Sequence, residues 1–203
     1  MKLGFFGGSF DPLHLGHVIP LLETREFLGL DRIILIPSSQ KIFRNDEAAQ
    51  EPEGASPCDR LNMLREFCRD YPFMAYDDYE IRSQRLVYSI ETVQYLLEHY
   101  HDDEPVLIIG RDNFERFHEW REYRRILELI PVAVMDRKDG MDDQPLILPG
   151  GVADPACFRM IPNRRIEISS TLVRQWCRCG RPIEWLVPAS VVNYIHQHHL
   201  YGV

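Results

Sequence analysis

The chain has 203 residues, of which 45% are hydrophobic and 27% charged, as is typical of a globular protein. Its formal net charge of −8 argues against a general nucleic-acid binder, because such proteins usually carry a basic surface. No apolar run is long enough to suggest a signal sequence or a membrane span, and the five scattered cysteines are typical of reduced thiols. We therefore expect a cytoplasmic protein that binds neither nucleic acid nor membranes.

The sequence of residues 2–55 predicts two strands, a helix and a long loop. Residues 2–6 form an apolar run that ends in Gly-Gly, which predicts a short buried strand. A helix is expected over residues 16–28, with Pro20 in its first turn, where proline is tolerated. A second strand is expected at residues 32–36, and the polar segment 38–55 is expected to be a long surface loop.

The next helix carries clear start signals. Ser56 suits the N-cap, Pro57 the first helical position and Asp59 the acid of a capping box. The apolar face of this helix is expected to contain Leu61, Leu64, Phe67 and Cys68. Ser89 is the expected cap of another helix.

The remaining elements follow from the same patterns. Strands are expected at residues 73–76, 105–110, 132–135, 158–161 and 166–168, helices up to Trp120 and at 123–129, 169–179 and 189–198, and a loop at 138–156. Strands that alternate with helices predict an α/β fold with a doubly wound parallel sheet. We expect a single domain over residues 1–203, with residues 169–203 as a small C-terminal helical part.

The segment from Gly7 to His17, GGSFDPLHLGH, joins the first expected strand to the first expected helix. Ligands of doubly wound folds bind at this kind of position, beyond the carboxyl ends of the strands. The glycines allow a sharp turn whose N–H groups, with the helix N-terminus, form an anion site. His14 and His17 lie three residues apart, so on a helix they share one face. Imidazole can donate to phosphoryl oxygens, and phosphoryl transfer needs mainly alignment and charge neutralisation.

This segment resembles the [T/S]-x-F-D-P-x-H-x-G-H signature of a nucleotidyltransferase superfamily. Residues 168–174, ISSTLVR, resemble the I-S-S-T-x-x-R motif that the same superfamily carries near its C-terminus. Taken alone, each feature has a plainer explanation. A Gly-Gly pair is typical of any turn, an H-x-x-H pair is typical of a surface or metal site, and the serines are typical of an ordinary helix cap. The two motifs together indicate membership, and they imply a Rossmann-like nucleotidyltransferase fold.

The resemblance implies adenylyl transfer from ATP, in which His14, His17 and Arg174 are catalytic. The implied ATP-binding residues are Gly8, Ser9, Phe10, His14, His17, Gly110, Asp112, Ile168, Ser169, Ser170, Thr171 and Arg174. Magnesium is expected to be carried by the ATP phosphates and water, so no protein metal ligands are expected.

Within the superfamily, the chain resembles the nicotinate-mononucleotide adenylyltransferases almost end to end. The matching segments are Asp59–Leu64, Tyr88–Thr92, Leu107–Asp112, Trp120 and Val187–Tyr201. The resemblance implies ATP and a pyridine mononucleotide as partners, with Lys41, Arg44, Tyr88, Ser89 and Trp120 binding the acceptor. Trp120 would stack on the pyridine ring; its alternative role is a helix-packing aromatic. Two family features, P-P-H-K and R-x-G-P, are absent, and both lie beside the acceptor site.

Several alternatives stay open from the sequence. The acceptor could instead be nicotinamide mononucleotide or phosphopantetheine, although phosphopantetheine adenylyltransferases are shorter and lack the tryptophan-bearing segment. A cytidylyltransferase is a further alternative. A non-catalytic nucleotide sensor on the same fold is the alternative from another class, since fold does not fix activity. A homo-oligomer is compatible with the sequence.

Overall fold

The computed structural model describes residues 1–39, 54–137, 150 and 155–203. Lys41 and Arg44, and most of the expected loops 38–55 and 138–156, lie outside the described residues. Contacts divide the chain into two compact units, each of three segments. Unit 1 comprises Met1–Gly7, Pro20–Ile34 and Val87–Arg165, and unit 2 comprises Gly8–Ile19, Leu35–Leu86 and Ile166–Val203. The expectation of a single domain stays a prediction.

A six-stranded sheet has the order β3-β2-β1-β4-β5-β6. The strands are β1 (Lys2–Gly8), β2 (Arg32–Pro37), β3 (Met74–Tyr76), β4 (Glu104–Gly110), β5 (Val132–Arg137) and β6 (Phe158–Asn163). β1 pairs with β4, β4 with β5 and β5 with β6, in each case in parallel. Along the chain, β2 and then β3 are added on one side of β1, and β4, β5 and β6 follow on its other side. The predicted doubly wound α/β fold is confirmed, and its topological switch point lies between β1 and β4.

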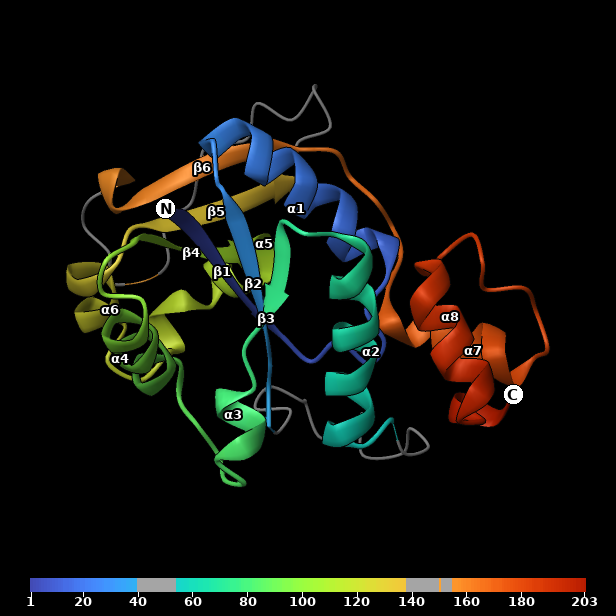
Figure 1. The fold of residues 1–203 in the computed structure, drawn as a ribbon. Coiled ribbons are helices and arrows are strands. Elements are labelled where there is room, and N and C mark those ends of the chain that lie inside the picture. The colour runs from blue at the N-terminus through green and yellow to red at the C-terminus, as the bar shows by residue number, and fades with distance from the viewer. Residues whose placement is uncertain (40–53, 138–149, 151–154) are drawn as a thin grey trace. The chain divides into compact units, whose positions relative to one another are not determined.

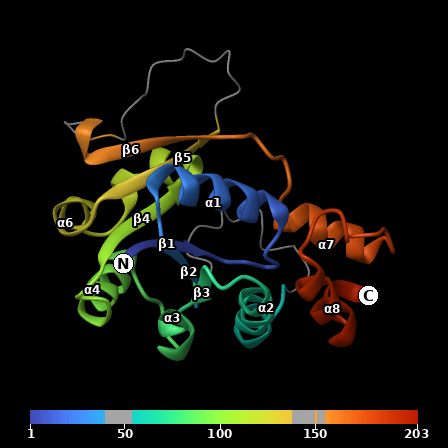
Figure 2. The ribbon, with the colours of Figure 1, turned by 45° about the horizontal axis from the view of Figure 1, so that its top comes forward.

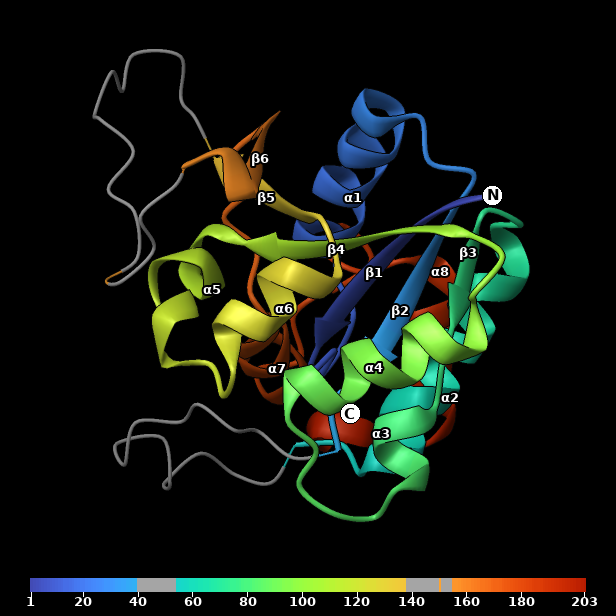
Figure 3. The ribbon, with the colours of Figure 1, turned by 90° about the vertical axis from the view of Figure 1, so that its left-hand side faces the viewer.

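In unit 1, helices lie on both faces of the strands. α4 (Ser89–His99) and α6 (Tyr123–Leu129) pack together on one face, whereas the unit 1 part of α1 (Leu15–Leu28) lies on the other (Figures 1 and 3). The chain between β4 and α6 forms α5 (Arg111–Glu115) and the short 3-10 helix η2 (Phe117–Glu119). Phe114 and Phe117 are fully buried, and both set their rings edge-on to Phe158 at the start of β6. This aromatic cluster fixes the segment that carries Asp112 and Trp120.

Unit 2 holds β3 and parts of β1, β2 and α1, and the rest of its regular structure is helical. It contains α2 (Pro57–Asp70), α3 (Tyr79–Arg82), α7 (Ser170–Arg178), α8 (Ala189–Gln197) and the 3-10 helix η4 (Leu200–Gly202). α2 and α8 lie side by side (Figure 2). The predicted caps at Ser56 and Ser169 are confirmed, since each hydroxyl accepts the N–H three residues on, from Asp59 at 3.1 Å and from Leu172 at 3.2 Å.

Three local expectations are wrong. Residues 166–168 are not a strand: β6 runs to Asn163, and the next N–H, from Arg164, donates to the Glu23 carboxylate instead of a neighbouring strand. Pro20 lies beyond the first turn of α1, because the His14 carbonyl already accepts the first helical N–H groups and starts the helix at Leu15. The residue that caps α4 is Tyr88, whose N–H donates to the Glu91 carboxylate.

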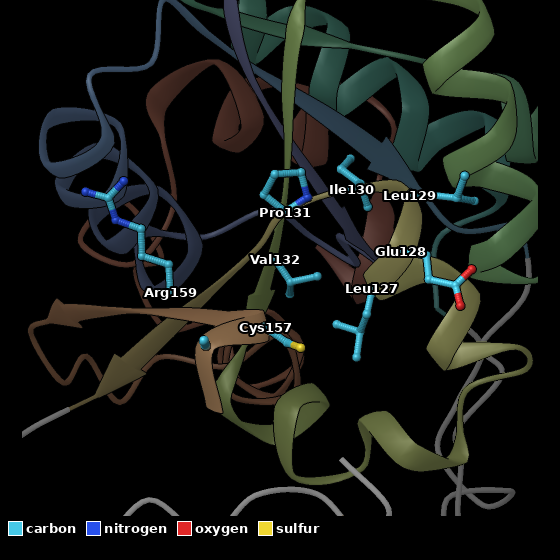
Figure 4. Close-up of a pocket in the computed structure, with 9 residues that line it drawn as sticks. Leu127, Glu128, Leu129, Ile130, Pro131, Val132, Cys157 and Arg159 are labelled. Atoms are coloured by element: carbon cyan, nitrogen blue, oxygen red, sulfur yellow. The ribbon is translucent and has the colours of Figure 1, made fainter. Parts of the chain in front are cut away.

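A cavity of about 350 Å³ in unit 1 is lined mostly by apolar side chains from α6, the start of β5 and the segment before β6 (Figure 4). Leu127, Val132 and Cys157 are among the residues that line it. This cavity lies at the amino ends of β5 and β6, whereas ligands of doubly wound folds bind at the carboxyl ends. Across the part of the chain that the structure describes, no helix has the length and apolar character to cross a membrane.

Candidate active site

The loop that follows β1 begins unit 2 and is folded tightly. Phe10 is fully buried and has a φ of 47°, in the left-handed region that a phenylalanine rarely adopts. The buried ring meets the ring of His17 edge-on at a centroid distance of 5.4 Å. The strained backbone at Phe10 therefore places an aromatic support directly against one histidine of the motif.

His14 and His17 come together as the sequence predicts. Their rings stack at a centroid distance of 3.8 Å and an interplanar angle of 27°. His14 is 4% exposed, whereas His17 is only half-buried, so His17 is the more accessible of the two.

The ring orientation of His17 is set by the backbone. The N–H of His14 donates to Nδ1 of His17 at 3.4 Å. Since Nδ1 accepts this bond, a neutral His17 ring carries its proton on Nε2. In that tautomer Nε2–H is the donor atom of the ring.

The second motif lies against the first in unit 2. The Ser170 hydroxyl donates to the carbonyl of Pro12 at 3.0 Å. A Cβ on Gly16 would lie 2.6 Å from the Ile168 carbonyl oxygen and 2.9 Å from Nδ1 of His14, closer than side chains come. Only glycine therefore lets the start of α1 approach the segment before α7 this closely. Two motifs far apart in the sequence form one site, which includes the N-terminus of the nine-residue helix α7.

Arg174, on the first turns of α7, is 3% exposed. Its guanidinium donates to the Asp11 carbonyl at 2.7 Å and to the Thr171 hydroxyl at 3.2 Å. Arg174 thus connects α7 to the loop of the first motif. The direct role in ATP binding that the resemblance implies for Arg174 stays a prediction.

Arg60 is a site residue to which the sequence analysis assigned no role. It is 3% exposed, and its guanidinium donates to the carbonyls of Ser9 at 2.6 Å and Ser38 at 2.7 Å. Burial lowers the pKa of this guanidinium below its usual value. Arg60 therefore ties together the two chain segments that leave β1 and β2. Its place in the segment Asp59–Leu64, which resembles the adenylyltransferases, was the only available signal.

The other predicted site residues that the structure describes belong to unit 1. Gly110 ends β4, and the exposed Asp112 follows it in α5. Trp120 is half-buried, with its ring 5.1 Å from that of Phe117.

Tyr88 and Ser89, at the start of α4, are also half-buried. The guanidinium of Arg121 lies over the Tyr88 ring at 4.8 Å. This pair brings the residue after Trp120 against the start of α4, so the predicted acceptor residues Tyr88, Ser89 and Trp120 belong to neighbouring segments of unit 1.

Metal-binding side chains do not cluster in the described ranges: no group of three or more His, Cys, Asp or Glu residues there could hold a metal ion. Magnesium often keeps several waters and binds through substrate phosphates rather than a protein cage.

Comparisons with known proteins show the family of the chain. A family model described as cytidylyltransferase-like matches residues 5–176, a range that contains both motifs. The chain is 36% identical over 202 residues to a "Probable nicotinate-nucleotide adenylyltransferase" of Roseiflexus sp. (strain RS-1), covering 98% of this chain and 97% of the relative. It is 32% identical over 206 residues to a protein of the same name from Dehalococcoides mccartyi (strain CBDB1), covering 99% and 97%.

Solved structures show the same fold. Nicotinic acid mononucleotide adenylyltransferase of Plasmodium falciparum, complexed with NaAD, superposes with a TM-score of 0.69 at 16% identity, covering 98% of this chain and 97% of that one. A nicotinate-nucleotide adenylyltransferase structure from Vibrio parahaemolyticus gives a TM-score of 0.65 at 18% identity, covering 99% and 95%. The chain therefore belongs to the cytidylyltransferase-like family of nucleotidyltransferases, and the relatives that it resembles over nearly its whole length are nicotinate-nucleotide adenylyltransferases.

Proposed function

We propose that the protein transfers the adenylyl group of ATP to nicotinate mononucleotide, giving nicotinate adenine dinucleotide and pyrophosphate. The observation that carries the proposal is the pair of stacked histidines, 3.8 Å apart, beside the N-terminus of α7 in unit 2. The choice of nicotinate mononucleotide as the acceptor rests on the names of the relatives given above.

The reaction is a single in-line displacement. A phosphate oxygen of the mononucleotide attacks the α-phosphorus of ATP and forms the new P–O bond. The bond from the α-phosphorus to the oxygen bridging to the β-phosphorus breaks, and pyrophosphate leaves with its electron pair. No covalent enzyme intermediate is needed, so the protein has to align the reactants and stabilise the developing charge.

The histidines are suited to the α-phosphoryl group. Nε2–H of His17 donates to a non-bridging oxygen, and a preorganised donor of this kind stabilises the transition state more than the ground state. His14 is buried behind His17, and its ring and N–H keep the His17 ring in place.

The start of α7 is suited to the leaving pyrophosphate. A helix N-terminus favours anions through its N–H groups and its dipole. Ser169, Ser170 and Thr171 stand at this terminus, with Ile168 just before it. The substrate is ATP in its magnesium complex, in which the ion is bound by phosphate oxygens and water.

The acceptor residues belong to unit 1. Trp120 presents an indole ring for stacking on the pyridine, a contact of about 1 kcal/mol. Tyr88 and Ser89 begin the 11-residue helix α4, whose N-terminus favours the carboxylate of nicotinate over the neutral amide.

One assay tests the proposal. The protein is incubated with magnesium and ATP, or with magnesium and CTP, and with nicotinate mononucleotide, nicotinamide mononucleotide or phosphopantetheine in separate reactions. Products are identified by mass, and pyrophosphate is measured in parallel. We expect nicotinate adenine dinucleotide to form fastest, with kcat/KM about ten- to a hundredfold above that of the amide. Faster use of another acceptor or of CTP would replace the proposal, and nucleotide binding without any product would identify a sensor.

A further inference from the structure

The carboxylate of Asp11, in the middle of the first motif, is 0% exposed. A buried carboxylate is costly unless donors surround it. Its Oδ1 accepts the N–H of Ala55 at 2.9 Å and the hydroxyl of Tyr201 at 2.8 Å, and Arg174 lies 3.8 Å from Oδ2. Three residues from two other segments of unit 2 therefore converge on one residue of the loop that leads to His14.

Tyr201 reaches this carboxylate from the last turn of the described chain. It belongs to η4, and its φ of 60° lies in the left-handed region, which a tyrosine rarely adopts. The hydroxyl contact spans 190 positions in the sequence. Burial, followed by the charge of Asp11, raises the pKa of Tyr201 far above its usual range. The hydroxyl consequently keeps its proton and remains a donor throughout neutral pH.

The loop between Asp11 and His14 is short, so a change at Asp11 is passed on to the histidines. The Asp11 carbonyl accepts from Arg174, and the next carbonyl, that of Pro12, accepts from Ser170. These bonds hold the backbone, while Tyr201 and Ala55 hold the side chain. Loss of the Tyr201 hydroxyl would leave a buried carboxylate oxygen short of one donor and free the loop to shift.

We propose that Tyr201 is a positioning residue for adenylyl transfer, which acts by holding Asp11 and, through it, the loop that carries His14. This role rests on the function proposed above. Under this proposal η4 supports the reaction centre through Asp11. Tyr201 itself does not contact the reacting atoms.

Tyr194 provides a matched control on the same C-terminal segment. Its hydroxyl donates to the Asp59 carboxylate at 3.0 Å and accepts from Asn62 at 3.1 Å. Both tyrosines thus bond an aspartate within unit 2, but only the partner of Tyr201 belongs to the first motif. Tyr201→Phe and Tyr194→Phe each remove one hydroxyl and keep the ring, so both variants are expected to fold.

The experiment measures kcat, the KM for ATP, the KM for nicotinate mononucleotide and the thermal unfolding midpoint of the full chain and both variants. We expect Tyr201→Phe to lower kcat about 10- to 100-fold with both KM values nearly unchanged, as slight misplacement of reacting groups does. Tyr194→Phe should keep the kcat of the unchanged protein. In a double-mutant cycle with Asp11→Asn, the losses in kcat should be less than additive, because both changes break the same contact.

Each other outcome overturns the role of Tyr201. Unchanged kcat in Tyr201→Phe would show that the contact does not serve the reaction. Equal losses in both variants, in step with their unfolding midpoints, would show a purely structural hydroxyl, as would additive losses in the cycle. If the protein without substitutions forms no dinucleotide, the proposed function itself is overturned. If that protein is active and Tyr201→Phe is equally active, only the positioning role is overturned.

Discussion

The N–H of His14 donates to Nδ1 of His17, and the two rings stack 3.8 Å apart. One backbone bond thus selects the tautomer of the neighbouring side chain and fixes the plane of its ring. The two histidines work as a pair, in which His14 orients the ring of His17 and His17 presents a donor. The predictions below start from this relationship and extend to the residues that support it.

Replacing His17 by alanine should lower kcat at least about 100-fold, the usual cost of losing a preorganised donor to a transition state. Folding should survive, because His17 is only half-buried. The measurement is steady-state turnover together with a thermal melt. His101→Ala, at an exposed position in unit 1, serves as the control. Near-normal turnover of His17→Ala would remove this motif from the catalytic centre.

Gly16→Ala should impair the enzyme although it adds a single methyl group. The new Cβ would meet the Ile168 carbonyl oxygen at 2.6 Å, so the start of α1 or the segment before α7 must move. We expect kcat/KM to fall about tenfold or more, since both motifs shift relative to each other. Kinetics with ATP as the varied substrate measure the effect. Full activity would mean that the two segments do not need their close approach.

Arg60→Lys should destabilise the protein even though the charge is kept. A guanidinium can donate to the Ser9 and Ser38 carbonyls at once, whereas an ammonium cannot match this fork geometry. We expect a loss of about 2 kcal/mol in the free energy of unfolding by urea. Arg65→Lys is the control, because Arg65 lies on the same helix but is exposed, and its guanidinium donates to the Tyr76 hydroxyl rather than to two buried carbonyls. Equal stability of the two variants would contradict this role of Arg60.

Arg174→Ala should raise the KM for ATP more than the KM for the mononucleotide, by about tenfold, and should also lower kcat. The guanidinium joins the first motif to the helix proposed to hold pyrophosphate. A neutral glutamine should not restore ATP use. Arg178→Ala, at an exposed position on the same helix, is the control. If both kinetic constants for ATP are unaffected in Arg174→Ala, α7 is only a structural helix.

Trp120→Ala should raise the KM for the pyridine mononucleotide about fivefold, which corresponds to the roughly 1 kcal/mol of a ring-stacking contact. The KM for ATP should stay nearly constant. Trp185→Ala provides the comparison, because Trp185 is 79% exposed and has no proposed role. Should the acceptor KM stay constant while the unfolding midpoint drops, Trp120 would be a packing residue on Phe117.

Local signals in the sequence were enough to predict the parts of the site that depend on neighbouring residues. The caps at Ser56 and Ser169 and the facing histidines all follow from spacings of three residues. Fold class followed from the alternation of strands and helices, and the two motifs supplied the family. These features need no knowledge of which distant segments meet.

The remaining features depend on contacts across long stretches of chain. Arg60 meets the carbonyl of Ser9 across 51 positions, and Tyr201 meets Asp11 across 190, and no local pattern marks either pair. The predicted strand at 166–168 failed for a related reason. Its alternation of Ile and Glu suits a strand, but the backbone at Arg164 bonds the Glu23 side chain, and the chain leaves the sheet.

The division into two units has a consequence for how the chain can be cut. Each unit is assembled from three segments, and the chain passes from one unit to the other five times, between Gly7 and Gly8 for the first time and between Arg165 and Ile166 for the last. No single proteolytic cleavage can therefore release either unit whole. During synthesis, unit 1 lacks β6 until residue 163 has been made, and unit 2 lacks the Tyr201 hydroxyl until residue 201 has been made. Asp11 in the first motif therefore acquires this hydrogen-bond donor only after 190 further residues have been added.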